Sequence, residues 1–166
     1  MIVQRFQKMH RYSNWAWAHV IQSVKQISEA DYKKERPFFW GSIHGTMAHS
    51  LAAEIIWIER LNGNNPTELL GADDFGSLDE ILDRWQTVKA QWDIYLKNLT
   101  PEIAASQIKY RSTEGEMREN NVADIIQQIQ NHGTEHRSQL TPVLFALGAA
   151  TEQLDFIYYC VLQEPG

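Results

Sequence analysis

The segment 122–147 repeats apolar residues at steps of three or four, which is the spacing of one face of a helix. Its stripe runs through Val122, Ile125, Ile129, His132, His136, Gln139, Val143 and Leu147. Two histidines therefore stand where a core would place leucine or isoleucine. Because a buried polar group needs a partner, each imidazole needs something to bond. One divalent metal ion is the most economical partner for two rings one helical turn apart.

Three further segments are predicted to form long helices. Residues 2–29 contain neither glycine nor proline and keep apolar residues at helical spacing. A second helix is expected from an N-cap at Ser42 to about Leu61, and it is apolar on most faces, which indicates deep burial. A third helix opens with a capping box at 77–80 and is closed by Thr100-Pro101.

The remaining segments are shorter. Residues 31–40 are expected to be a connector, and 62–76 a loop rich in Asn, Gly, Pro and Asp. Partial alternation of polar and apolar residues over 107–119 predicts a small β-hairpin. The histidine helix should start at an Asn121 N-cap and end at Gly148, with a kink at Pro142, whose ring clashes with the carbonyl four residues earlier.

Four long amphipathic segments in 166 residues predict an all-α four-helix bundle in a single domain, residues 1–166. Apolar residues make up 43% and charged residues 22%, as in an ordinary globular domain. Residues 152–162 are expected to add a short C-terminal helix. We expect this helix to pack through Leu154, Ile157, Tyr158 and Leu162.

The charge balance argues against nucleic acid as a partner. The formal net charge is −6, and no cluster of Lys and Arg forms a basic patch. No apolar run reaches the length of a membrane span, and residues 1–8 show no secretory signal. Cys160 is the one cysteine, so no intrachain disulfide can form. We therefore expect a cytoplasmic protein that binds neither nucleic acid nor membranes.

Catalytic sites of the zinc type use three protein ligands, so a third partner is needed beside the histidine pair. His49 is the preferred candidate, because small residues on its helix face would leave space beside the ring. These neighbours are Gly45, Thr46, Ala52 and Ala53. His44 points well away from His49 on the helical wheel and is the reserve, whereas His10 and His19 have no such surroundings.

Two other interpretations remain open at this point. A histidine on an apolar face is often a core residue bonded to a carbonyl or to water, which would leave a plain interaction module without metal. The string His132-x-x-Glu135-His136 also matches an inverted zinc-protease motif. That motif needs an acidic ligand well downstream on another helix. Only Glu152 and Glu164 are glutamates after His136, which disfavours the protease.

Several motifs resemble the DinB/YfiT-like family, in the right order over most of the chain. They lie at 41–49 and 57–63, typical of the family's second helix, and at 110–116, 132–139 and 155–159. The motif at 132–139 resembles the family's H-x-x-x-H-R-G-Q, with Ser138 in place of glycine. The resemblance implies an up-down-down-up bundle with a three-histidine metal site. Carried over to this chain, its ligands are His49, His132 and His136.

The resemblance also implies a chemistry, because the family includes thiol-dependent S-transferases and a maleylpyruvate isomerase that uses a small thiol. A divalent ion on three imidazoles can lower the pKa of bound water to roughly 7, or bind a thiol as thiolate. We expect a metal-dependent transferase or hydrolase with Zn or Ni, or else Fe or Mn, and with a small thiol as co-substrate. A homodimer is expected too. The alternative is a non-enzymatic stress-response bundle whose metal is structural or vestigial.

Other residues are candidates for supporting the site. Gln139 lies on the histidine stripe and could orient a ligand or water, or bond between helices. Glu135 could accept the free ring N–H of a ligand histidine, or simply be solvated. Trp15, Trp57 and Trp85 could wall a pocket, with core packing as the default. No general acid or base follows from the sequence.

Overall fold

The computed structural model describes residues 1–37 and 40–163. Four long helices of 19 to 25 residues dominate it, namely α1, α3, α4 and α6. The elements are α1 Ile2–Val24, α2 Glu29–Lys33, α3 Ile43–Leu61, the 3-10 turn η1 Ala72–Asp74, α4 Leu78–Asn98, α5 Pro101–Ala105, β1 Gln107–Arg111, β2 Met117–Asn121, α6 Val122–Ala146 and α7 Phe156–Leu162. The predicted all-α class with one small hairpin is confirmed.

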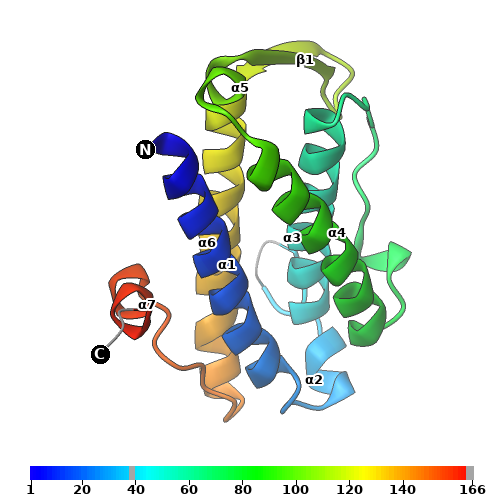
Figure 1. Cartoon of the computed structure of the whole chain (residues 1–166). Coiled ribbons are helices and arrows are strands. Elements are labelled where there is room, and N and C mark those ends of the chain that lie inside the picture. The colour runs from blue at the N-terminus through cyan, green and yellow to red at the C-terminus, as the bar shows by residue number, and fades with distance from the viewer. Residues whose placement is uncertain (38–39, 164–166) are drawn as a thin grey trace.

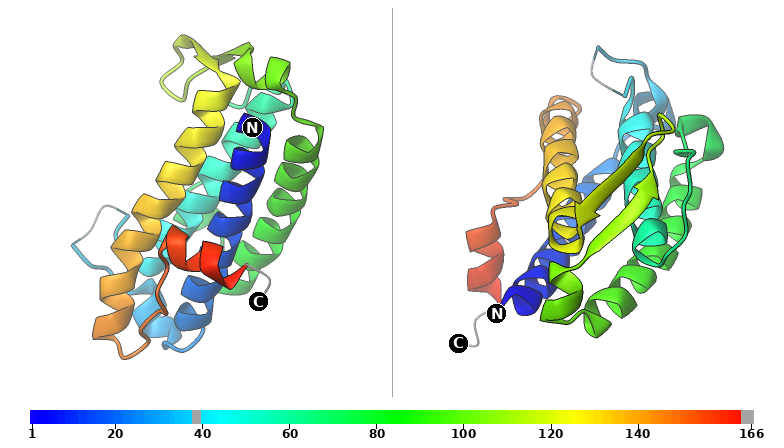
Figure 2. Two further views of the ribbon diagram at one scale, coloured as in Figure 1. Left: turned by 60° about the vertical axis from the view of Figure 1, so that its left-hand side comes forward. Right: turned by 90° about the horizontal axis from the view of Figure 1, so that it is seen from above.

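The four long helices form a single bundle. Figure 1 shows α1 and α6 running down the bundle while α3 and α4 run up it, which is the predicted up-down-down-up order. The stretch 62–77 returns the chain along the bundle, so α3 and α4 can be parallel. α6 packs between α1 and α3, and α4 packs on α3. The hairpin lies across one end of the bundle (Figure 2).

Predicted capping residues begin three of the helices. Ser42, Ser77 and Asn121 each accept, through the side chain, a hydrogen bond from a backbone N–H two or three residues further on. The Glu80 carboxylate of the predicted capping box accepts from the N–H of Gly76 rather than from that of Ser77. These bonds satisfy N–H groups that the helix itself leaves unpaired.

The first helix is shorter than predicted. It ends at Val24 instead of 29, and the connector contains the short helix α2. The cause is Ser28, whose hydroxyl oxygen accepts a hydrogen bond from the N–H of Asp31 at 3.0 Å. A serine with an acidic residue three positions later is a helix-start signal. Here this local signal prevails over the apolar pattern, which continues to residue 29.

The hairpin extends two residues beyond its predicted end. Gln107 pairs with Asn121, so Asn121 both ends β2 and caps α6. Gly115 has φ +86° and supplies the left-handed residue of the turn. The following helix, α6, continues through Pro142 as one α-helix. The kink expected at Pro142 stays a prediction.

The C-terminal helix packs through other residues than predicted. Tyr159 is buried against Tyr12 of α1, and Leu154, which precedes the helix, is partly buried beside them. The remaining predicted contacts are exposed or nearly so: Ile157, Tyr158 and Leu162. α7 has only seven residues, and the face that carries Tyr159 is the one turned to α1. For Ile157 and Leu162 the packing prediction was therefore wrong.

One large cluster of buried residues draws on all four long helices. Fully buried members include Val20, Met47, Trp92 and Ile126, one from each helix. Most residues of α3 are buried, as its apolar faces predicted. Among the described residues, no helix is long and apolar enough to cross a bilayer. The core thus holds α3 and α6 side by side, and these are the helices that carry the histidines of the predicted site.

Candidate metal centre

Three imidazole rings meet between α3 and α6. The Nε2 atom of His132 lies 3.0 Å from Nε2 of His49 and 3.1 Å from Nε2 of His136. One nitrogen from each ring lies within 4.8 Å of the others. In the described part of the chain, no carboxylate or thiol joins this group. The structure therefore brings the three predicted ligands together, and metal binding itself stays a prediction.

Helix geometry explains why the rings meet. His132 and His136 are one turn apart on α6, so their side chains share a face. His49 reaches them from α3, which packs directly on α6. The small residues Ala52 and Ala53 on the same part of α3 are buried, as expected for positions that let the two helices approach.

Gln139 fixes the orientation of one ring. Its Oε1 lies 2.9 Å from Nδ1 of His136, so this Nδ1 carries the proton and donates it. In the neutral ring, Nε2 of His136 then presents its lone pair to the other two rings. Outer partners of this kind hold a ligand histidine in the correct tautomer.

The nitrogen geometry fits a shared metal ion. Two ring nitrogens that bind one ion at about 2.1 Å each lie roughly 3 Å apart when they meet at about a right angle. The two short nitrogen–nitrogen distances, 3.0 and 3.1 Å, match this value. When the His136 ring is neutral, its Nε2 carries no proton, so at most two of the three Nε2 atoms can carry one. A cation would satisfy all three lone pairs at once.

Burial keeps two of the rings neutral. It lowers the pKa of His49 from 6.5 to about 4, with a further contribution from His136 nearby. Burial also lowers the pKa of His132 to about 3, helped by the positive charge that His136 and His49 could carry. Their lone pairs are free near neutral pH, as metal binding requires. Protons should compete for these two rings only below the ordinary imidazole range.

Trp40 is a site residue that the sequence reasoning missed. Its indole stacks on the imidazole of His49, with ring centroids 3.5 Å apart and planes inclined by 13°. Its edge also approaches His136, at 6.5 Å between centroids. The side chain is partly exposed, so it covers one face of the cluster at the protein surface. An aromatic residue two positions before a helix cap is a weak signal, because it follows no periodicity.

Gly45 explains how Trp40 comes so close. A Cβ atom at this position would overlap the carbonyl oxygen of Trp40. Glycine in the first turn of α3 therefore lets the preceding chain lie directly on the helix. A glycine in the first turn of the helix is the one sequence signal for this contact, and it was interpreted only as a small neighbour of His49.

Arg137, the residue after His136, is another buried polar group on α6. Its guanidinium donates to the hydroxyls of Ser13 and Thr134, each at 3.0 Å. It also lies over the rings of Tyr12 and Trp17. These contacts tie the residue after His136 to α1, which holds α6 in position at the site.

The other candidates have separate roles. His44 contacts the hydroxyl of Tyr32 at 3.1 Å and the carbonyl of Ala72 at 3.0 Å, so it is a structural residue. Glu135 is exposed, and Gln139 takes the role considered for it. The tryptophans considered as pocket walls lie outside the histidine cluster. Trp15 packs on Tyr159 of α7 and Trp57 on Tyr110, whereas Trp85 packs on Trp17 and lines a separate groove with it.

His10 and His19 also lie outside the cluster. His10 Nε2 is 3.0 Å from a carboxylate oxygen of Asp93. His19 packs on Trp15 and lies 3.6 Å from Glu152. Both were predicted to have no part in the site, and both are engaged by other residues.

The fold and the histidine cluster together define a class, namely four-helix bundles with three imidazoles clustered between the second and the last long helix. Comparison with known families gives that class a name. The chain belongs to the DinB family, whose model matches residues 1–166. It is also similar to Protein DinB of Bacillus subtilis (strain 168), with 20% identity over 159 residues. The match covers 92% of this chain and 91% of the relative.

Proposed function

We propose that the protein binds one divalent metal ion per chain through Nε2 of His49, His132 and His136. The convergence of these three nitrogens carries the proposal. The low pKa values of His49 and His132 support it, because a neutral imidazole is the form that binds a metal. The hydrogen bond from His136 to Gln139 supports it as well.

Three imidazoles suit several metals. Zn and Ni are the first candidates, and Fe and Mn are also compatible with nitrogen ligands. Three protein ligands also leave coordination positions for a substrate, whereas structural zinc sites are closed by four. We therefore favour an enzymatic site over a purely structural one.

The proposed activity is that of a metal-dependent transferase acting with a small thiol, or of a hydrolase. When bound, a divalent ion supplies Lewis acidity, which favours the deprotonated form of a thiol or of water near neutral pH. The chain's own residues do the positioning. Gln139 holds the ring of His136, and the indole of Trp40 keeps solvent from one face of His49. A reducing cytoplasm suits a thiol co-substrate, and we place the protein there.

Elemental analysis tests the metal site. Protein prepared without a nickel column is loaded with Zn or Ni, desalted and analysed. Wild type should retain about one ion per chain, and His49→Ala, His132→Ala and His136→Ala should each lose most of it, since two imidazoles hold an ion loosely. His19→Ala is the matched control and should retain the ion. Equal metal in wild type and His136→Ala would refute the site.

A spectrum tests whether the site is open. The Co(II)-loaded protein should change its visible absorption when a small thiol is added, because a free position can accept the sulfur. The same addition to His49→Ala, treated identically, serves as the control. If the visible absorption of the loaded wild type does not change when thiols or anions are added, the metal is structural and the protein is a non-enzymatic bundle.

A further inference from the structure

A groove separate from the histidines lies between α1 and α4. It has a volume of about 310 Å³ and shares no residue with the metal centre, which α3 and α6 carry. Small-molecule sites typically measure roughly 300 to 1,000 Å³. The groove is therefore large enough for a compact organic molecule.

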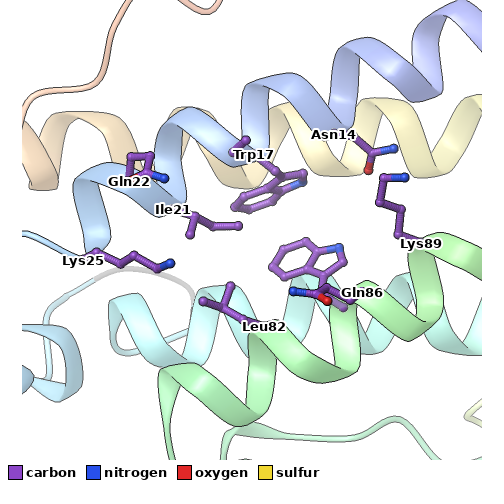
Figure 3. Close-up of a pocket in the computed structure, with 10 residues that line it drawn as sticks. Asn14, Trp17, Ile21, Gln22, Lys25, Leu82, Gln86 and Lys89 are labelled. Carbon is purple, nitrogen blue, oxygen red and sulfur yellow. The ribbon is translucent and has the colours of Figure 1, made fainter.

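Two indoles form the floor of this groove. The rings of Trp17 and Trp85 lie 4.7 Å apart between centroids, and both side chains are almost fully buried. Ile21 of α1 and Leu82 of α4 continue the apolar surface toward one end, as Figure 3 shows. The two ring planes are inclined by 56°, so the indoles form an apolar, aromatic floor that is angled and not flat. Aromatic rings also pack favourably in such tilted arrangements.

The polar rim of the groove is positive. Its ten lining residues include Lys25 and Lys89 and no carboxylate, although the chain as a whole has 21 acidic and 15 basic residues. Lys89 is already bonded to Asp93 at 2.6 Å. Lys25 has no ion pair among the described residues, and Figure 3 shows its amine extended toward Ile21 and Leu82. Lys25 is thus the cation available to a ligand.

We propose that the α1–α4 groove binds an anionic amphiphile, a flat aromatic body that carries one negative group. The aromatic part lies on Trp17 and Trp85, between Ile21 and Leu82. The negative group pairs with Lys25. This site is independent of the proposed metal, so it should bind equally well in metal-free and metal-loaded protein.

Fluorescence titration with 8-anilinonaphthalene-1-sulfonate, an anionic aromatic probe, tests the groove. Wild type should bind one molecule per chain, with energy transfer from tryptophan, because the two indoles lie at the floor. Circular dichroism and a sharp thermal transition must accompany the titration, since loosely folded protein also binds this probe. Binding that never saturates, or that needs partly unfolded protein, would overturn the proposal.

Charge variants locate the probe. Lys25→Glu should weaken binding about fivefold, the effect of one exposed ion pair. Ala18→Glu places a carboxylate on the exposed wall of the groove and should also weaken binding, whereas Ala18→Gln, of the same shape, should do so much less. Lys34→Glu makes the same charge change outside the groove and should leave the affinity unchanged.

A neutral analogue separates charge from apolar contact. N-phenyl-1-naphthylamine lacks the sulfonate, so it should bind more weakly than the anion and should respond little to Lys25→Glu. Equal affinity of wild type, Lys25→Glu and Ala18→Glu for the anionic probe would place it elsewhere and refute the site. So would light scattering that shows a wild-type dimer split by these variants, because the groove would then be an interface between two copies.

Discussion

Glu54 carries a carboxyl group into the helix packing, although part of the residue reaches solvent. Its Oε2 accepts a hydrogen bond from the indole nitrogen of Trp85 at 3.3 Å. Burial raises the pKa of the carboxyl from 4.5 to about 7, against the opposing effects of Trp85 and of Arg137. Near neutral pH this residue is therefore close to its midpoint, and protein stability should depend on its proton.

The raised pKa predicts a stability that falls as pH rises. The protonated carboxyl stabilises the fold fully below pH 4.5, and this contribution is lost as pH rises through about 7. Glu54→Gln keeps an oxygen for Trp85 and has no proton to lose. Relative to wild type, the variant should gain up to about 3 kcal/mol of unfolding free energy between the two limits. Urea unfolding of both proteins across this range measures the difference, and parallel curves would contradict the prediction.

At the residue scale, the sequence predicted the ligands better than their surroundings. The pair His132 and His136 could be predicted because the period of a single helix places both side chains on one face. His49 followed from its small neighbours and from the family resemblance. The stacking of Trp40 depends on a turn between two segments, and no period in the sequence encodes such a contact. The same holds for Glu54, whose burial depends on where α4 packs.

At the scale of elements, helix existence was predictable and helix ends were less so. The long segments were found because many residues contribute to each apolar stripe. The end of α1 depended on a single serine, Ser28, against a pattern that continued. The packed face of α7 could not be read from seven residues, since both of its sides are apolar.

The start of α3 provides a test at this scale. Gly45→Ala should destabilise the protein, although alanine favours helix, because the new Cβ would overlap the carbonyl of Trp40. We expect a loss of about 1–3 kcal/mol, the usual cost of overpacking. Displacement of Trp40 from His49 should also change the near-ultraviolet circular dichroism. Thermal unfolding measures the loss.

A second glycine, Gly71 before η1, controls for the change in chain entropy. At Gly71 a Cβ would meet nothing closer than 3.9 Å, so Gly71→Ala should leave stability nearly unchanged. If Gly45→Ala is as stable as this control, the close approach of the connector to α3 does not constrain the fold.

At the scale of the whole molecule, the parallel helices α3 and α4 each contribute to a different site on the bundle. The histidine cluster lies where α3 meets α6, and the apolar groove lies where α1 meets α4. The net charge of −6 disfavours a phosphate backbone as partner, and the expected lack of nucleic-acid binding stays a prediction. The long return 62–77 makes this arrangement possible, because parallel neighbours need a connection as long as the helix.

The oligomeric state is the last prediction. The family resemblance implies a homodimer, but α3 offers no apolar face for it, because Ile43, Met47 and Leu51 are fully buried inside the bundle. α7 instead carries a pair of exposed apolar residues, because Ile157 is 72% and Val161 59% exposed. These two residues are four apart and share one helix face. We expect the chain to form a homodimer that buries this face.

Light scattering at micromolar concentration should give twice the 19.2 kDa of one chain. Ile157→Glu and Val161→Glu should shift the mass toward that of the monomer, because each places an unpaired charge in the interface. Ile94→Glu changes an equally exposed isoleucine on α4 and should leave the mass unaltered. A monomeric wild type would contradict the dimer. A dimer that survives both α7 variants would show that the two copies meet through another face.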